Sequence, residues 1–269
     1  MSVESTNLTE ARKFIIGIMP PAGEILRNQF DTTGLNSRLK NPRDIVTQAD
    51  LDVDQFLRES IAQKFPEAKF LTEETAPEDY LNLKEEEDLW VIDSMDGTWN
   101  FFTGNPNFAI SVGLVSRAVA RMGVVFVPIA NKLYFAQEDL EYAFLNNKPV
   151  KGVSEIQALE GCSFLCDWVA SERGRLKTFN FFSKVFNKVG PIKSMGSAVA
   201  DLASLTEGRV DAYLICGLKA WDVAATSLLV KKAGGIITTP EGNAWNVFEP
   251  DIFVTNPTLH PQFIKAFKG

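Results

Sequence analysis

Acidic side chains stand where two predicted strands end and where one predicted helix begins. Glu73 follows a short apolar run, Asp93 and Asp96 follow the apolar residues 90–92, and Asp222 begins a helical pattern. Strand ends and helix starts can meet at one edge of a sheet, so these carboxylates can converge there. Carboxylate oxygens are preferred ligands of hard divalent cations such as Mg²⁺. Spacing alone favours a magnesium site no more strongly than ordinary turn and helix-capping roles.

The segment from Asp93 to Thr98 also has the outline of an anion site. Gly97 permits a tight turn, and the main-chain amides of Gly97 and Thr98 can face a phosphate if a helical turn begins there. Cations held by the neighbouring carboxylates would neutralise that phosphate from its other side. This combination is typical of phosphoryl transfer that uses no histidine base.

The composition is consistent with that chemistry and excludes several classes of protein. The 269 residues include 34 Asp and Glu but a single histidine, His260. Histidine is the commonest general base near neutral pH, so Ser-His-Asp hydrolysis and histidine-rich zinc sites are poor candidates. The net charge of −7 disfavours a nucleic-acid partner or an anionic membrane surface, because both require clustered Lys and Arg.

Three features of the sequence predict a cytoplasmic protein with no membrane partner. Residues 1–9 are polar, and the first apolar run, residues 14–19, is too short for a secretory signal. No run approaches the roughly 18 apolar residues that a membrane span requires. Cys162, Cys166 and Cys216 cannot all pair within the chain and lack the clusters of a zinc site. We therefore expect buried free thiols in a reducing compartment.

Hydrophobic periodicity divides the chain into two halves. Residues 8–30 and 47–64 have helical patterns, with a break or kink expected at Pro20-Pro21 because proline removes a hydrogen-bond donor. Short apolar runs then predict a largely antiparallel sheet, with strands at 69–71, 89–92, 109–115, 122–127 and 132–135. After residue 150, strands and helices alternate, which indicates helices packed on a second sheet.

We therefore predict an α+β half over residues 1–150 and an α/β half over residues 151–269. The first carries Asp50, Glu73, Asp93 and Asp96, and the second carries Asp222 and a loop on the substrate side. The second half is expected to contain helices at 171–188, 197–207, 220–233 and 258–267 and strands at 162–166, 191–194, 211–215, 235–238 and 252–254. The Phe-rich residues 179–186 are expected to pack in the core.

Four segments, in order along nearly the whole chain, resemble the inositol monophosphatase family. Residues 90–101, WVIDSMDGTWNF, are similar to the family pattern W-[IV]-[IV]-D-P-[IL]-D-G-T-x-N-F. Residues 221–225, WDVAA, with a downstream AGG at 233–235, resemble the second family pattern, W-D-x-A-[AG] followed by A-G-G. Residues 44–50, DIVTQAD, resemble D-x-V-T-x-x-D, and residues 72–74, TEE, resemble G-E-E. Four ordered matches of this kind are specific.

The resemblance implies a layered αβαβα sugar-phosphatase fold and the Mg²⁺-dependent, Li⁺-sensitive hydrolysis of a small-molecule phosphate monoester by a homodimer. It implies two or three Mg²⁺ ions. The ligands of the first would be Glu73, Asp93 and the main-chain carbonyl of Met95. The ligands of the second would be Asp93, Asp96 and Asp222, with Asp93 bridging the two ions.

The resemblance also implies catalytic and substrate-binding roles. Thr98 and Asp50 are similar to the pair that positions or deprotonates the attacking water, and Glu73 would assist through a further, weaker ion. Residues that correspond to the family's substrate contacts are Asp96, Gly97, Thr98, Gly196, Ser197, Ala198 and Asp222.

The chain departs from the family pattern at several positions. Ser94 replaces the usual proline and Thr72 the usual glycine, changes that affect loop rigidity more than chemistry. Ile215 stands where inositol-selective members have a glutamate that accepts hydrogen bonds from substrate hydroxyls. Inositol 1-phosphate is therefore a less secure expectation than phosphatase activity. Lys219 either contacts a second anionic group of the substrate or pairs with a surface acid.

Other functions on the same scaffold stay open. They are fructose-1,6-bisphosphatase, histidinol-phosphatase and 3′-phosphoadenosine 5′-phosphate phosphatase activity. A non-catalytic regulatory protein is a further alternative. It is disfavoured because every expected metal ligand is present in the sequence.

Overall fold

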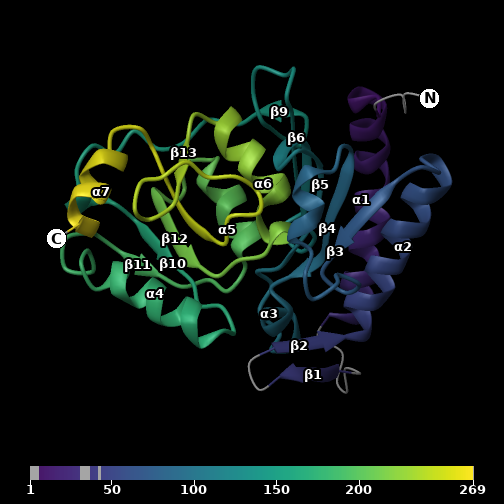
Figure 1. Cartoon of the computed structure of the whole chain (residues 1–269), viewed down its shortest axis with the longest axis horizontal. Coiled ribbons are helices and arrows are strands. Elements are labelled where there is room, and N and C mark those ends of the chain that lie inside the picture. Colours follow the sequence, from purple (N-terminus) through teal and green to yellow (C-terminus); the bar gives the residue numbers. More distant parts are fainter. Residues whose placement is uncertain (1–5, 31–36, 42–43, 269) are drawn as a thin grey trace.

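The computed structural model describes residues 6–30, 37–41 and 44–268. Their helices and strands form five layers, which Figure 1 shows edge-on from right to left. Two helices cover one face of a seven-stranded sheet, two helices lie between that sheet and a five-stranded sheet, and two helices cover the far side. The αβαβα fold expected from the resemblance is confirmed.

The first sheet has the strand order β3-β4-β5-β6-β7-β8-β9. In this strand order, β3 and β4 are parallel, and every other neighbouring pair is antiparallel. The long central strands are apolar on both faces, because helices cover both. The strands are β3 (Lys69–Thr72), β4 (Leu89–Asp96), β5 (Ala109–Ser116), β6 (Val119–Val127), β7 (Lys132–Gln137), β8 (Phe144–Leu145) and β9 (Lys148–Pro149).

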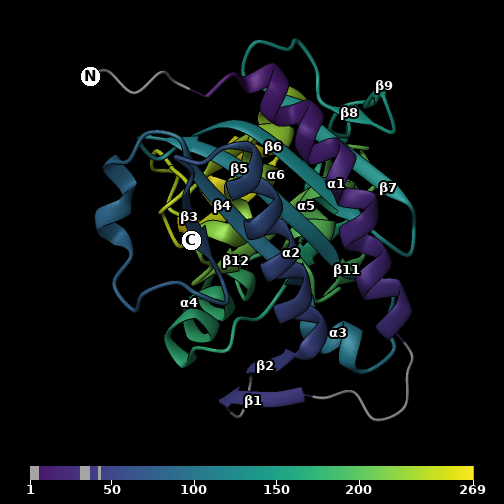
Figure 2. The same cartoon turned by 90° about the vertical axis from the view of Figure 1, so that its right-hand side faces the viewer.

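Helices α1 (Leu8–Gln29) and α2 (Gln48–Lys64) lie side by side on the outer face of this sheet, as Figure 2 shows. The break expected at Pro20-Pro21 is wrong, because α1 is continuous across both residues. Both prolines face solvent, while Met19 and Ala22 beside them are buried against the sheet. Burial of the apolar face therefore outweighs the lost hydrogen bonds. Ahead of α2, β1 (Ser37–Asn41) and β2 (Asp44–Thr47) form a hairpin that the sequence analysis did not predict.

The second sheet has the order β11-β10-β12-β14-β13 and is mixed. Strands β10 and β12 are parallel, whereas β14 runs antiparallel to β12 and β13. Helices α4 (Glu172–Phe182) and α7 (His260–Lys268) cover its outer face. The strands are β10 (Phe164–Cys166), β11 (Ile192–Lys193), β12 (Ala212–Cys216), β13 (Ile236–Thr238) and β14 (Asp251–Thr255).

The helix predicted over residues 171–188 is shorter than expected, because α4 ends at Phe182. The Phe-rich residues 179–186, which begin within α4, divide between core and surface. Phe181 and Phe182 pack against the apolar cluster under α7, but Phe179 and Phe186 are 55% and 51% exposed. The helix expected over residues 258–267 is α7, which begins at His260, and this histidine is half-buried. The three cysteines are free and buried, as predicted.

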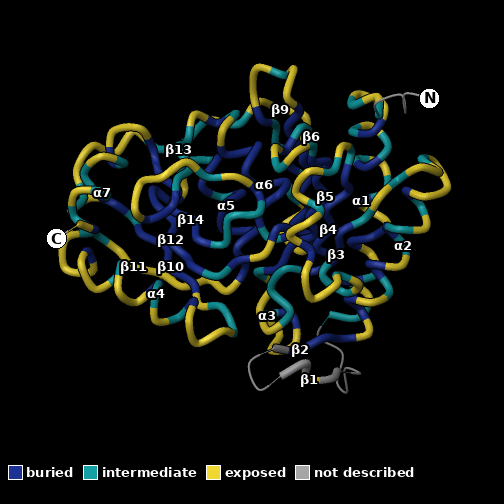
Figure 3. Tube along the Cα trace, in the orientation of Figure 1, coloured by how far each residue is buried: buried dark blue, intermediate teal, exposed yellow. Residues whose placement is uncertain are grey.

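Helices α5 (Ala198–Leu205) and α6 (Ala220–Lys232) form the central layer, which Figure 3 shows as mostly buried. Small residues allow α6 to lie very close to the first sheet. A Cβ atom at Gly123 would lie 2.5 Å from the carbonyl oxygen of Ala225, and one at Gly113 would lie 2.9 Å from the Cβ of Ala224. This close approach fixes the start of α6, and Asp222 with it, against the end of β4.

Two short 3₁₀ helices, η1 (Leu81–Glu85) and η2 (Leu159–Gly161), and the short helix α3 (Thr98–Phe102) complete the described elements. At 22 residues, α1 is the longest helix in the described ranges. Neither α1 nor any other described helix combines the length and hydropathy that a bilayer span needs.

Candidate functional site

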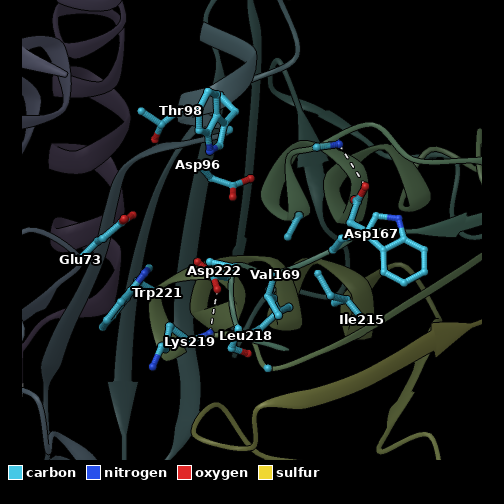
Figure 4. A pocket seen from close by; sticks show the side chains of 18 of the residues that line it. Glu73, Asp96, Thr98, Asp167, Val169, Ile215, Leu218, Lys219, Trp221 and Asp222 are labelled. Atoms are coloured by element: carbon cyan, nitrogen blue, oxygen red, sulfur yellow. Dashed lines mark hydrogen bonds between the residues drawn. The ribbon is translucent and has the colours of Figure 1, made fainter. Parts of the chain in front are cut away.

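A cavity of about 750 Å³ opens where the two sheets meet the central helices. Figure 4 shows Glu73, Asp96 and Asp222 toward one side of it, Asp167 and Ile215 toward the other, and Val169 and Leu218 between them. The lining comes from the ends of β3, β4 and β12, the starts of α3, α4, α5 and α6, and the loops between them. The predicted site residues that line it are Glu73, Met95, Asp96, Gly97, Thr98, Gly196, Ala198 and Asp222.

A β-bulge at the end of β4 brings Asp93 and Asp96 to the same side of the strand. Asp93 pairs with Ser111 of β5, and Asp96 pairs with Ala109, so β4 carries one extra residue between the two pairs. Residues three apart in a regular strand point to opposite faces, and an extra residue reverses that relation. Carboxylate oxygens of Asp93, Asp96 and Asp222 consequently lie within 4.8 Å of one another. We call these three residues the acidic cluster.

Hydrogen-bond donors reach only part of the acidic cluster. Asp93 is fully buried, and its Oδ1 accepts the amide of Met95 at 3.1 Å, while its Oδ2 has no hydrogen-bond partner. Asp222 Oδ2 accepts the amide of Lys219 at 2.7 Å. Asp96 Oδ2 accepts the amide of Val199 at 2.8 Å and also the Ser197 hydroxyl. A buried carboxylate oxygen without a donor is costly, so Asp93 Oδ2 requires a proton or a cation.

Burial and mutual repulsion raise the pKa of every member of the acidic cluster. Burial, and then the charges of Glu73 and Asp96, hold the pKa of Asp93 well above its usual range. Burial raises the pKa of Asp96 to about 7, against the lowering effect of its hydrogen bonds. Burial and the charge of Asp96 likewise raise the pKa of Asp222. Three acids with raised pKa values at one point are the electrostatic signature of a cation site.

Glu73 lies beside the acidic cluster rather than within it. It follows β3, and its amide donates to the carbonyl of Ile92 at 3.3 Å, which ties the loop to β4. Its charge is the largest carboxylate contribution to the raised pKa of Asp93. Among the described residues, the group of acids whose carboxylate oxygens all lie within 4.8 Å of one another consists of Asp93, Asp96 and Asp222, without Glu73. Glu73 therefore lines the same cavity as the acidic cluster and lies at its edge, and its role as a metal ligand stays a prediction.

Asp50 and Thr98 contact each other beneath the cavity. Thr98 Oγ1 lies 3.1 Å from Asp50 Oδ1 and 3.1 Å from the carbonyl oxygen of Met95. The other oxygen of Asp50 accepts the amide and the hydroxyl of Thr47, at 2.7 and 2.6 Å, in a box that caps α2. Burial raises the pKa of Asp50 to about 7. Asp50 thus both caps a helix and presents one oxygen to Thr98.

Gly97 and the segment 196–198 form the adjoining wall. Gly97 has a φ of 95° and precedes the helical turn of α3, the turn that the sequence analysis expected. A Cβ atom at Gly97 would lie 3.0 Å from the carbonyl of Asn107, so a larger residue does not fit. Ser197 caps α5 by accepting the amide of Ala200 at 3.2 Å. Gly196 and Ala198 line the cavity on either side of it.

The sequence analysis missed a second pair of buried acids. Asp167 follows β10, and Asp201 lies in α5; their relative exposures are 4% and 3%. Asp167 Oδ1 accepts the Ser194 hydroxyl and the next two amides at 2.8 to 3.1 Å, and Oδ2 accepts the Tyr213 hydroxyl at 3.2 Å. Burial, and then repulsion by Asp167, raises the pKa of Asp201 to about 10, so Asp201 is protonated and bonds to Asp167. The sequence signal that could have indicated this pair was Asp201, an acid within the otherwise largely apolar residues 198–205.

Part of the cavity wall beyond Asp222 is apolar. Val169, Ile215 and Leu218 line it, and Ile215 occupies the position of the expected departure from the family. Two cations also line the cavity. The ammonium of Lys219 lies 5.9 Å from the centre of the Tyr80 ring, and among the described residues it forms no ion pair with a surface acid. The contact with a second substrate anion stays a prediction. Arg175, which the sequence analysis did not single out, is the second cation.

Comparisons with known proteins agree with the geometry. The family model described as the inositol monophosphatase family matches residues 7–269. The chain is 33% identical over 251 residues to an inositol monophosphatase of Mesembryanthemum crystallinum, with 92% of each chain covered. It is 30% identical over 254 residues to a fructose-1,6-bisphosphatase/inositol-1-monophosphatase of Thermotoga maritima, with 94% of each covered.

Solved structures give the same result for the fold. The extragenic suppressor protein suhB of Bartonella henselae superposes with a TM-score of 0.86 at 29% identity, covering 96% of this chain and 98% of that one. A family model and whole-length relatives thus agree with the motifs and with the layered fold. The chain belongs to the inositol monophosphatase family.

Proposed function

We propose that the protein is a Mg²⁺-dependent phosphate monoester hydrolase. The observation that carries the proposal is Asp93 Oδ2, a buried oxygen without a hydrogen-bond partner inside a cluster of three carboxylates. Such an oxygen fits a hard divalent cation, which prefers carboxylate ligands. The names of the relatives, an inositol monophosphatase and a dual-activity fructose-1,6-bisphosphatase, support the reaction class.

The donor set fits the two or three Mg²⁺ ions that the resemblance implies. One ion would be held by the acidic cluster, and another by Glu73, Asp93 and the carbonyl of Met95. Bound cations would neutralise the phosphate and make a coordinated water more acidic. Asp93 would contribute to both sites, which agrees with its central position and with its two carboxylate oxygens having different surroundings.

Asp50 and Thr98 are the proposed acceptors of the proton of the attacking water. The proton would pass to the Thr98 hydroxyl as that hydroxyl donates to Asp50 Oδ1, the contact observed at 3.1 Å. The Thr47 hydrogen bonds hold the carboxylate so that Oδ1 faces Thr98. A general base works best when its pKa lies near the working pH, and the pKa of Asp50 is about 7.

The phosphate would be held from the protein side by main-chain amides at Gly97 and Thr98. The alcohol portion of the substrate would then extend toward Gly196, Ser197 and Ala198. The Ile215 side chain cannot accept hydrogen bonds from substrate hydroxyls, so we propose a sugar or polyol phosphate other than inositol 1-phosphate as the preferred substrate.

The test is phosphate release by Asp93→Asn compared with the parent protein. The variant keeps the size of the side chain but loses the charge, so turnover is expected to fall by about 10³-fold while the fold is retained. Asp79→Asn is the matched control, because Asp79 is exposed and does not line the cavity. Turnover by a folded Asp93→Asn protein close to that of Asp79→Asn would overturn the proposal.

A regulatory role without catalysis is the second candidate function. The structural relative from Bartonella henselae is named as an extragenic suppressor protein, a name that states a genetic effect rather than a reaction. The intact acidic cluster favours catalysis, because it brings together the three carboxylates that the resemblance assigns to a metal site. Mg²⁺ binding without phosphate release from any ester of a broad panel would favour the regulatory role.

We also propose that the protein acts as a homodimer in the cytoplasm. Trp99, Phe102 and Met195 are 40% to 43% exposed. They gather around the hydrogen bond from Asn100 to the carbonyl of Met195, at 2.8 Å, so they form one exposed apolar patch. Three buried free thiols suit a reducing compartment. Sedimentation analysis of Phe102→Asp should give a monomer, and a dimer unchanged by the substitution would contradict this surface.

A further inference from the structure

Arg175 lines the cavity without an acidic partner. It is partly buried near the start of α4, and its Nε donates to the carbonyl of Val169 at 2.8 Å. Lys177, two residues later, forms ion pairs with Glu241 and Asp251. Within the part of the chain that the structure describes, the Arg175 guanidinium has no carboxylate within 4.0 Å. A guanidinium has five N–H donors, and the bond to Val169 uses one of them.

The position of Arg175 is fixed by tight packing of α4 on β12. A Cβ atom at Gly174 would lie 2.4 Å from Val169 Cγ2 and 2.6 Å from the carbonyl oxygen of Cys216, so only glycine fits there. The amide of Cys216 also donates to the buried hydroxyl of Thr178 at 2.9 Å. Arg175 therefore stands on a rigid part of the wall, and little ordering is required when it binds a ligand.

The surroundings of Arg175 select the kind of group that it can bind. Asp167, which also lines the cavity, already accepts four hydrogen bonds. The other cation of the cavity, Lys219, points away from Ile215 in Figure 4, and its ammonium lies 5.9 Å from the centre of the Tyr80 ring. Val169, whose carbonyl accepts the bond from Arg175, lines the cavity together with the apolar residues Ile215 and Leu218. An unpaired cation beside an apolar wall favours an anionic group supplied by the ligand.

We propose that Arg175 binds a second anionic group, a phosphate or a carboxylate, on the alcohol portion of the substrate. The proposal rests on the proposed function, since the ester phosphate would occupy the opposite end of the cavity. The connecting part of the substrate lies against Val169, Ile215 and Leu218. Arg175 is then a binding residue for the group that remains on the alcohol after hydrolysis.

The experiment compares pairs of substrates that differ in the second anion. Fructose 1-phosphate and fructose 1,6-bisphosphate test a phosphate, and glycerol 1-phosphate and 3-phosphoglycerate test a carboxylate. In Arg175→Gln, KM for the preferred doubly anionic substrate should rise by about 10- to 100-fold, the loss expected for a charged hydrogen bond. Its kcat, and both constants for the singly anionic partner, should change little.

Two further variants separate binding from folding. Arg175→Lys keeps the charge and should recover part of the lost affinity. Arg173→Gln is the matched control, since Arg173 lies on the exposed side of the same helix and does not line the cavity. Equal changes for both members of each pair, or no change in either, would overturn the proposal. Failure of the parent protein to hydrolyse any of the four esters would instead count against the proposed function.

Discussion

Two groups of buried carboxylates lie near the same cavity and are stabilised in different ways. Asp201, whose pKa is raised to about 10, holds a proton beside Asp167, and Asp167 accepts two amides and two hydroxyls. The acidic cluster of Asp93, Asp96 and Asp222 receives fewer donors for its central residue, and Asp93 Oδ2 receives none. Burial of acids therefore does not by itself mark a cation site. Asp201 Oδ2 also has no donor, but one proton held on Asp201 satisfies that pair. Three carboxylates converge at Asp93, so the number of converging acids, set against the donors that reach them, distinguishes a structural pair from a site that requires a cation.

The largest expected effect comes from making the same substitution in each group. Asp222→Asn removes a charge from the acidic cluster and should lower kcat/KM by about 10³-fold. Asp201→Asn replaces a protonated acid by an isosteric amide and should leave kcat/KM within a few-fold of the parent value. Steady-state phosphate release measures both. Equal losses in the two variants would remove the distinction between the groups.

Asp50 combines features of both groups and gives the next largest effect. Its Oδ2 is satisfied by Thr47, while its Oδ1 faces Thr98. Asp50→Asn should lower kcat by about 10²-fold, because a correctly positioned general base usually accelerates a reaction by about that factor. The matched control is Asp52→Asn, because Asp52 lies in the same helix and bonds to Gln29 and Gln48 outside the cavity. A kcat for Asp50→Asn equal to that of the control would exclude the proposed proton acceptor.

The pair of Asp167 and Asp201 should make stability fall as pH rises. The folded protein holds a proton on Asp201 up to about pH 10, and the unfolded chain releases it above its usual pKa of 3.8. Between pH 3.8 and about pH 10, each unit rise in pH lowers the free energy of unfolding by up to about 1.4 kcal/mol through Asp201. Denaturant unfolding at pH 6 to 9 should show a smaller slope for Asp201→Asn than for the parent protein.

A second substitution at the same position checks the role of the hydrogen bonds. Asp201→Ala leaves Asn107 and Asp167 without their partner, so it should be about 1–3 kcal/mol less stable than Asp201→Asn. Identical stability of the two variants, or an unchanged pH slope in Asp201→Asn, would mean that the pair shares no proton.

Mg²⁺ binding should show the opposite dependence on pH. Protons compete with cations for the acidic cluster, and the pKa of Asp96 is about 7 without metal. Affinity should therefore weaken by about tenfold for each pH unit below 7, and binding should release protons. Calorimetry in two buffers of different ionisation enthalpy measures both quantities. Affinity independent of pH between 6 and 8 would indicate that these carboxylates do not hold the ion.

The sequence predicted the residues of the site better than their geometry. Asp93, Asp96 and Asp222 belong to short patterns whose order along the chain is informative. The bulge that brings Asp93 and Asp96 to one side depends on pairing with β5, which no local pattern encodes.

The sequence predictions failed mainly where the structure depends on contacts between segments that are distant in the chain. Asp167 and Asp201 are 34 positions apart and meet only because β10 and α5 pack together. Helix α1 continues through Pro20-Pro21 because its buried face is held by the sheet. Both outcomes depend on tertiary packing, which overrides local preference.

The most direct test of the central claim is calorimetric Mg²⁺ binding by three proteins at pH 8. The parent protein and Asp201→Asn should bind Mg²⁺ with similar affinity and gain thermal stability from it. Asp93→Asn should lose at least about tenfold in affinity, because its buried oxygen no longer carries a charge. Mg²⁺ binding by folded Asp93→Asn as tight as that of the parent protein would contradict the account.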